Sequence, residues 1–157
     1  MNVVDLEISL VTSGPDPGPA DVVTVLAVST NDEEHRRLES IFKHSRWRLL
    51  RSRSAREALE LLRDLAAPVV IADTCLPDQG WRQLLASLLD LPHPAPRLVV
   101  ASRLAEDTLW QDVLSSGGYN VLEIPYESRE VFWVVSHAWR DWKAERERRG
   151  VKAAGAN

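Results

Sequence analysis

The chain has 157 residues, of which 45% are hydrophobic and 27% charged, and its net charge is −4. These values are typical of one globular domain with short additions. A single cysteine, Cys75, excludes an internal disulfide framework and a multi-cysteine metal cluster. No apolar run approaches the roughly 20 residues of a membrane-spanning helix, and the acidic start of the chain is unlike a signal peptide. We therefore expect a cytoplasmic protein that does not enter a membrane.

The negative charge is concentrated in residues 1–21, which have no lysine or arginine and four acids: Asp5, Glu7, Asp16 and Asp21. Because the remaining residues are balanced in charge, no nucleic-acid partner is predicted. Residues 4–10 alternate apolar and polar side chains, the period of a half-buried strand. Residues 13–21 contain three prolines and two glycines and indicate a linker. The sequence leaves open whether residues 4–10 pair with a sheet edge or lie outside the fold.

Residues 22–143 alternate predicted strands with predicted helices. The strands are expected over residues 22–28, 47–51, 68–72, 97–101 and 120–124, with apolar side chains at helical spacing between them. The last helix is expected from about residue 128 into a charged tail at 144–157. This order predicts an α/β protein with a doubly wound, five-stranded parallel sheet of (βα)5 type and right-handed crossovers, preceded by the N-terminal segment.

Functional side chains of such sheets gather at the carboxyl ends of the strands. Asp73, directly after the third predicted strand, is the one charged side chain that the pattern places at a central strand's end. No glycine-rich phosphate loop follows the first strand, which argues against a dinucleotide or nucleoside-triphosphate site.

Two segments carry a family resemblance, namely residues 69–80 (VVIADTCLPDQG) and Ile124-Pro125-Tyr126. They resemble the receiver domain of bacterial two-component response regulators, over about residues 22–143. The resemblance implies a flavodoxin-like fold, Asp73 as the phospho-acceptor and a cis bond before Pro125. It also implies two acids after the first strand that hold Mg²⁺, a hydroxyl at the end of the fourth strand and a lysine before the cis-proline.

The residues at those family positions differ from the family pattern. The two acids fall on Ser29 and Thr30, the hydroxyl position on Ala101 and the lysine position on Ile124. Hydroxyls are poor Mg²⁺ ligands, and an aliphatic side chain cannot balance a phosphoryl charge. We therefore expect a degenerate receiver, or pseudo-receiver, with no metal, no cofactor and no enzymatic activity.

Three functions remain open. The first is a stand-alone signalling and interaction module that works without phosphorylation. The second is an active single-domain response regulator, phosphorylated on Asp73 by a histidine kinase in a Mg²⁺-dependent phosphorelay. The third is a flavodoxin-like binder of a small ligand in the pocket around Ser29, Thr30 and Asp73, which the fold alone does not exclude.

The last predicted helix has more aromatic side chains than one sheet-facing stripe requires. Phe132 and Trp139 fall at the edge of the apolar stripe and Trp133 falls outside it. In receivers, the fourth helix, fifth strand and fifth helix bind partners, and Trp110 lies on the fourth predicted helix here. We expect these four residues to bind a protein partner or a second copy, because Trp dominates interface hot spots. The opposing interpretation is that they fill the core.

Residues 43–56 form a basic run with no acid: Lys43, Arg46, Arg48, Arg51, Arg53 and Arg56. Without an accompanying binding motif, this run is interpreted as a solvated helix end and edge strand.

Overall fold

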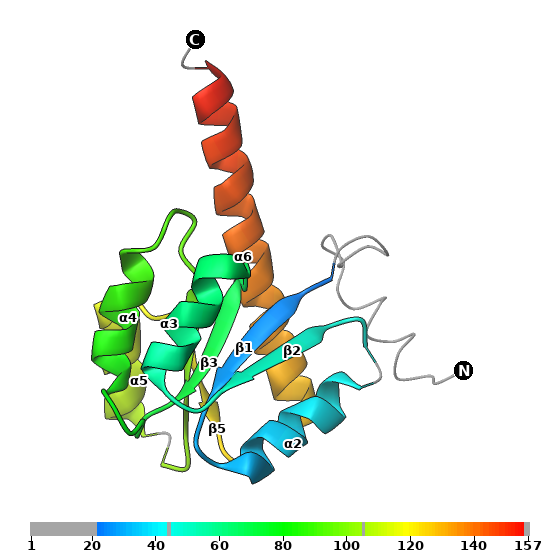
Figure 1. Ribbon diagram of the computed structural model, residues 1–157, viewed down its shortest axis with the longest axis vertical. Coiled ribbons are helices and arrows are strands. Elements are labelled where there is room, and N and C mark those ends of the chain that lie inside the picture. The colour runs from blue at the N-terminus through cyan, green and yellow to red at the C-terminus, as the bar shows by residue number, and fades with distance from the viewer. Residues whose placement is uncertain (1–21, 44, 105, 156–157) are drawn as a thin grey trace.

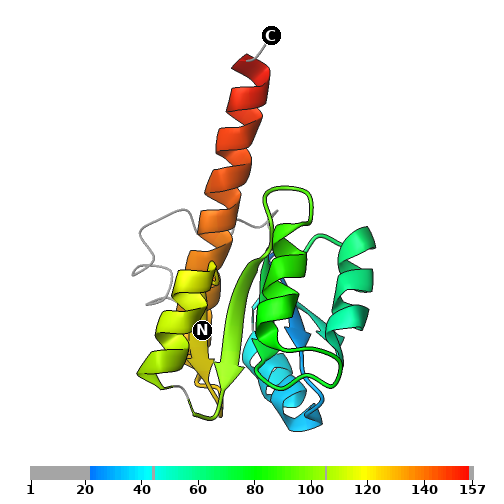
Figure 2. The ribbon, with the colours of Figure 1, turned by 90° about the vertical axis from the view of Figure 1, so that its left-hand side faces the viewer.

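The computed structural model describes residues 22–43, 45–104 and 106–155, so the strand and linker predicted within residues 1–21 lie outside the described residues. Five parallel strands form one sheet in the order β2-β1-β3-β4-β5, with helices on both faces (Figures 1 and 2). In chain order the elements are β1 (Thr24–Val28), α2 (Asp32–Phe42), β2 (Arg48–Ser52), α3 (Ala55–Asp64), β3 (Val69–Asp73), α4 (Trp81–Leu89), β4 (Arg97–Ser102), α5 (Asp107–Ser116), β5 (Asn120–Glu123) and α6 (Ser128–Gly155). The predicted doubly wound architecture is confirmed.

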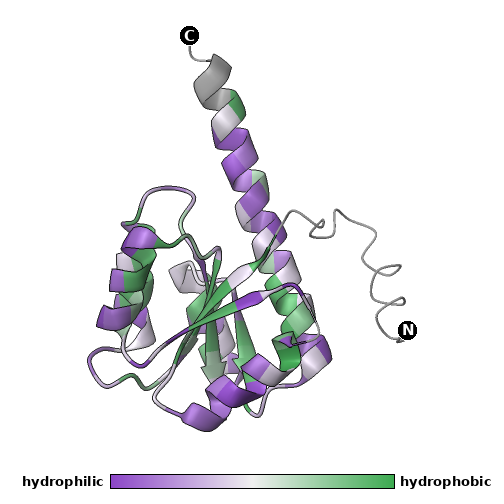
Figure 3. Cartoon of the chain, turned by 45° about the vertical axis from the view of Figure 1, so that its right-hand side comes forward, coloured by the Kyte–Doolittle hydropathy of each residue, from purple (hydrophilic) through white to green (hydrophobic). Residues whose placement is uncertain are grey.

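The central strands are apolar on both faces because helices cover both faces of the sheet. On β1 and β3 every residue is buried except Thr24 and Asp73, which are partly exposed. The hydrophobic side chains form two clusters, one with α2 and α6 and the other with α3, α4 and α5. Figure 3 shows this distribution, with hydrophobic residues on the strands and hydrophilic ones along the outer sides of the helices.

Local capping sets several helix boundaries. The Ser54 hydroxyl accepts a hydrogen bond from the Glu57 N–H at 3.1 Å, as expected for the N-cap of α3. Gly117 ends α5 in the left-handed conformation, with φ of 103°, which glycine adopts without a side-chain clash.

Helix α6 has 28 residues and extends well past the sheet (Figure 1). The predicted charged tail at 144–157 therefore continues as helix to Gly155. Residues such as Ala, Glu and Arg favour helix there, and Glu145 and Arg149 form an ion pair at 2.8 Å, one helical turn apart. None of the helices in the described ranges is long and apolar enough to cross a membrane.

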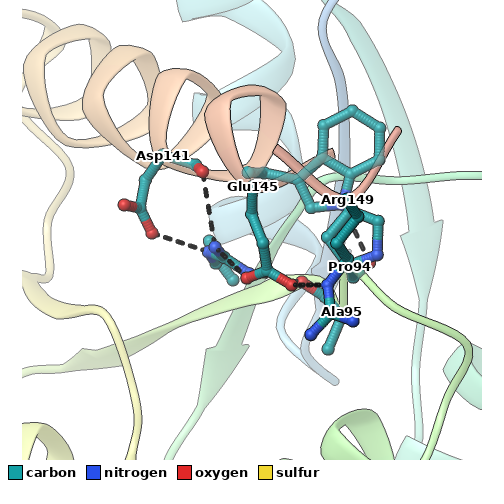
Figure 4. Close-up of polar contacts among 7 residues, drawn as sticks. Pro94, Ala95, Asp141, Glu145 and Arg149 are labelled. Atoms are coloured by element: carbon teal, nitrogen blue, oxygen red, sulfur yellow. Dashed lines mark hydrogen bonds and ion pairs between the residues drawn. The ribbon is translucent and has the colours of Figure 1, made fainter. Parts of the chain in front are cut away.

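Arg97, the first residue of β4, fixes α6 where it leaves the sheet. Its side chain is only 15% exposed and contacts Asp141 at 2.8 Å and Glu145 at 2.7 Å. Nearby, the Trp142 indole N–H donates to the Pro94 carbonyl at 3.0 Å. Figure 4 shows that these contacts tie one side of α6 to the start of β4 and to the residues just before it. The emerging helix is thus held in one direction by charged hydrogen bonds as well as by packing.

Candidate functional site

Asp73 closes β3 at the carboxyl edge of the sheet, where it lies in register with Ala101 of β4. Its side chain is partly buried, and the Thr74 hydroxyl is 3.5 Å from its Oδ1. Ala101 is fully buried and has no hydroxyl. The neighbouring Ser102 is also buried, but its hydroxyl accepts the N–H of Leu104 at 3.1 Å. Ser102 therefore shapes the loop after β4.

Ser29 follows β1 and organises the turn into α2. Its carbonyl accepts a 2.8 Å hydrogen bond from Nε2 of the buried His35, and its hydroxyl accepts the N–H of Asn31 at 3.0 Å. The same hydroxyl donates to Glu34 Oε1 at 3.3 Å. Thr30, the other predicted pocket position, is exposed. Of the two hydroxyls at the acid positions, that of Ser29 is thus engaged within the fold.

Glu34 is a site residue that the sequence analysis missed. It lies in the first turn of α2 and is 6% exposed. Burial raises the pKa of the Glu34 carboxyl, the negative charge of Asp73 raises it further, and the Ser29 hydrogen bond and the Arg103 charge oppose this shift. The Arg103 guanidinium is 3.8 Å from Glu34 Oε2. A signal was present in the sequence, because Glu34 is spaced from Leu38 and Ile41 like a member of the buried helical face.

The segment after β5 has the expected backbone. The bond between Ile124 and Pro125 is cis, as the resemblance implied. Ile124 is 6% exposed, so an aliphatic side chain occupies the position of the family's lysine. Tyr126 is buried, and this burial raises the pKa of its hydroxyl. Its carbonyl accepts the Nε–H of Arg37 at 3.0 Å, which ties the segment to α2.

A cavity of about 340 Å³ lies beside this segment. Its lining residues come from α2, the loop after β4 and the segment after β5: Glu33, Glu34, Arg36, Arg37, Arg103, Ile124, Pro125 and Tyr126. Acids and arginines are both present, so the cavity has no single dominant charge. It can accept a polar group, but it does not present a concentrated anion-binding surface.

The residues around Asp73 do not fit the Mg²⁺ site of the family. Within residues 22–43, 45–104 and 106–155, no three His, Cys, Asp or Glu side chains are grouped so that they could hold a metal ion. Glu34, the second carboxylate near Asp73, already contacts Ser29 and Arg103. Mg²⁺ is usually bound through one or two carboxylates, and Ser29 and Thr30 place hydroxyls at the two positions where the family has acids.

The four aromatic interface candidates divide into exposed and buried residues. Trp133 is 59% exposed, and its ring contacts that of His137 in a tilted arrangement with 4.2 Å between ring centroids. Trp110 is 47% exposed, and its indole N–H donates to Asn120 Oδ1 of β5 at 3.0 Å. The prediction that Trp139 belongs to an exposed interface is wrong, because it is 4% exposed and packs in the core. Phe132 is partly buried at a ring-centroid distance of 4.7 Å from Trp47.

Trp139 is buried because the buried face of α6 is wider than its apolar stripe predicts. The helix packs in the cluster that also contains α2 and the aromatic side chains near β2, so a wide stripe is covered. Trp139 and Phe132 at the edge of the predicted stripe therefore contact other side chains. Trp133, outside the stripe, remains exposed.

An open parallel sheet in the order β2-β1-β3-β4-β5 defines a flavodoxin-like α/β protein, and its site lies at the carboxyl ends of the strands. The chain is similar in structure to the signal receiver domain of an HD domain-containing protein from Pseudomonas fluorescens Pf-5, with a TM-score of 0.73, 22% identity and coverage of 87% of this chain and 97% of that chain. The chemotaxis response regulator CheY4 of Vibrio cholerae matches with a TM-score of 0.67, 14% identity and coverage of 74% of this chain and 98% of that chain.

A third similar structure is the beryllofluoride-activated NtrC4 receiver domain dimer, with a TM-score of 0.69, 19% identity and coverage of 76% of this chain and 98% of that chain. No family model and no curated protein sequence matches the chain. The chain thus has the fold of response-regulator receiver domains.

Proposed function

We propose that this protein is a receiver-like signalling module that acts through protein contacts and does not depend on phosphorylation. Receiver domains are signalling modules that bind partner proteins. The receiver fold of this chain therefore supports a signalling role. The observation that carries it is the chemistry around Asp73. Ser29, Ala101 and Ile124 occupy the positions where the family has a metal-binding acid, a hydroxyl and a lysine.

The charges around Asp73 support this function. Phosphoryl transfer depends on positioning and on positive charge that meets the developing negative charge. The Glu34 carboxyl lies close enough to Asp73 to interact with it, and its raised pKa reflects burial and repulsion from Asp73. A dianionic phosphoryl group there would add to the same repulsion. The Arg103 guanidinium lies 3.8 Å from the Glu34 carboxylate, so part of the positive charge of Arg103 is already compensated by Glu34.

The proposed interaction surface is formed by α5, β5 and α6, with Trp110 and Trp133 as its exposed aromatic residues. Large aromatic side chains exposed to solvent favour association. The NtrC4 receiver similar to this chain is a dimer, so self-association is the first interaction to measure. The protein is proposed to act in the cytoplasm, without nucleic acid as a partner and without enzymatic activity of its own.

A second candidate is an active response regulator phosphorylated on Asp73, with a histidine kinase as its partner. The observation in its favour is that Glu34 and Arg103 bring one acid and one cation to the pocket from non-family positions. In that function Arg103 would replace the missing lysine as the group that neutralises phosphoryl oxygens.

Intact-mass spectrometry after incubation with acetyl phosphate and Mg²⁺ separates the two functions. The expected spectrum is that of the unmodified chain, for wild type as for Asp73→Asn. Addition of one phosphoryl group to wild type but not to Asp73→Asn would overturn phosphorylation independence. In that outcome, loss of the modification in Arg103→Gln would assign the neutralising charge to Arg103.

A further inference from the structure

Helix α6 has a second stripe of side chains on the face that points away from the sheet. The stripe that faces the sheet contains Val131, Val135 and Ala138, which are fully buried. Successive residues of a helix are about 100° apart, so the positions on the opposite side follow one another at steps of four and three residues. We call this set the outer stripe: Trp133, His137, Arg140, Ala144, Glu147 and Val151. None of them is buried, and steps of this kind are the contact positions of paired helices.

The two ends of the outer stripe are apolar and exposed. Trp133 is 59% exposed where α6 covers the sheet, and Val151 is 74% exposed on the part of the helix that extends past the sheet (Figure 1). That extending part is otherwise largely hydrophilic (Figure 3). Contact with another chain would remove both side chains from water, which is favourable.

The middle of the outer stripe has one charge of each sign. Ion pairs within a helix join residues three or four apart, whereas Arg140 and Glu147 are seven apart, or roughly 10 Å along the helix axis. Among the described residues neither of them forms an ion pair. Ala144 lies between them, and its short side chain leaves room for a long side chain opposite it. Both charges are thus available to a second helix.

We propose that the outer stripe binds the same stripe of a second copy of this chain, with the two α6 helices antiparallel. The inference names the partner of α6 and rests on the part of the proposed function that assigns this helix to protein contacts. A two-fold axis between the helices makes the surface self-complementary, so each contact occurs twice. The contacts are Trp133 with the partner's Val151, His137 with the partner's Glu147, and Arg140 with the partner's Ala144.

Charge complementarity selects the antiparallel direction. In that register Arg140 lies within one helical turn of the partner's Glu147, so opposite charges meet across the interface. Parallel helices would place Arg140 against the partner's Arg140 and Glu147 against the partner's Glu147, and like charges would repel. Because the outer stripe points away from the sheet, the two sheets lie on the outer sides of the helix pair and do not collide.

Sedimentation equilibrium of the full chain tests the contact. Wild type is expected to dimerise, and Val151→Asp is expected to raise the dissociation constant of the dimer at least about tenfold, because it places a charge against Trp133. The matched control is Gly150→Asp, which adds the same charge one residue earlier, about 100° around the helix, where a Cβ meets nothing within 4 Å. The control is expected to dimerise like wild type. A wild type that stays monomeric up to the millimolar range, or a Val151→Asp dimer as tight as wild type, would overturn the proposal.

A nitroxide spin label at position 130 tests the direction of the helices. Glu130 is exposed near the start of α6, and the label is attached to Glu130→Cys/Cys75→Ser so that no other thiol reacts. In the antiparallel register the two labels are separated by about 24 residues of helix, or roughly 36 Å along its axis. Parallel helices would bring them to roughly the interaxial distance of 8–10 Å. A measured distance near the shorter value would overturn the antiparallel contact.

Failure of this contact and failure of the proposed function give different results. A dimer that is unchanged in Val151→Asp but lost in Trp110→Ser would assign self-association to α5 and would overturn the α6 contact alone. Phosphorylation of Asp73 in the mass measurement would overturn phosphorylation independence, whereas the α6 contact is decided by the dimer of the unmodified chain.

Discussion

The hydroxyl of Ser29 lies 3.3 Å from Oε1 of Glu34, and both side chains are buried. In the receiver family, the position of Ser29 belongs to an acid that faces the phospho-acceptor. Here the hydroxyl at that position binds a carboxylate that enters from the next helix. Glu34 thus places a carboxylate near Asp73. This carboxylate contacts Ser29 and Arg103, whereas the acid of the family binds Mg²⁺.

Glu34→Gln is expected to raise the free energy of unfolding at pH 7. Burial and the Asp73 charge raise the pKa of Glu34 in the folded state, so its ionised form is more costly in the folded than in the unfolded chain. This cost is present above the folded pKa and disappears as the pH falls toward the usual glutamate value of about 4.3. Thermal unfolding of both proteins between about pH 4 and pH 7 measures the difference. A lower stability of Glu34→Gln at pH 7 would contradict the electrostatic account.

Arg97→Ala is expected to destabilise the protein by about 1–3 kcal/mol at pH 7, because it removes charged hydrogen bonds to Asp141 and Glu145. The hydrogen bond from Arg97 is the largest cause that lowers the pKa of Glu145, while partial burial opposes it. A carboxyl whose pKa is lowered in the folded state stabilises the fold at pH values above its usual pKa of about 4.3. This stabilisation is lost as the pH falls through the folded-state pKa. The difference between variant and wild type in denaturant unfolding should therefore shrink below about pH 4. A pH-independent difference would point to lost packing alone.

Trp133→Ala and Trp139→Ala are expected to have opposite consequences. Trp133 is 59% exposed, and its removal should change stability by less than about 0.5 kcal/mol. It should weaken self-association or partner binding by about 2 kcal/mol, as loss of an interface anchor does. Trp139 is in the core, and its removal should cost about 3–5 kcal/mol of stability. Sedimentation and denaturant unfolding of the two variants separate these effects, and a large stability loss in Trp133→Ala would contradict an exposed role.

Asp78→Ala is expected to cost about 1 kcal/mol, the usual value for loss of a helix cap. The Asp78 carboxylate accepts the N–H of Ala55 at 3.1 Å and that of Arg56 at 2.9 Å, at the start of α3. Although burial alone would raise the pKa of Asp78, these backbone donors lower it. Faster hydrogen exchange at the Ala55 and Arg56 amides would confirm the contact. Asp64→Ala, at the other end of α3, is the control and should show no loss.

Much of the fold was predictable because its signals are local. The apolar runs around Val25, Val70 and Val99 predict strands that are buried on both faces, and all three lie in the centre of the sheet. Ser54 indicated the start of a helix and Gly117 the end of one, because serine is preferred at helix N-caps and glycine just after helix C-termini. The segment Ile124-Pro125-Tyr126 indicated the cis bond by resemblance.

The tertiary structure alone decided which side chains meet. Trp133 is exposed and Trp139 is buried because neighbouring elements cover only part of the surface of α6. Helical spacing predicts the direction in which the apolar side of a helix points, but not how wide the covered side is. Asp78 caps a helix 22 residues earlier in the chain, a distance that no local pattern reports. Glu34 approaches Asp73 only because β1 and β3 are neighbours, so their carboxyl ends share one edge. The sequence determined the elements and their order through local propensity and periodicity, whereas the charges of the pocket were set by contacts that exist only after the sheet has formed.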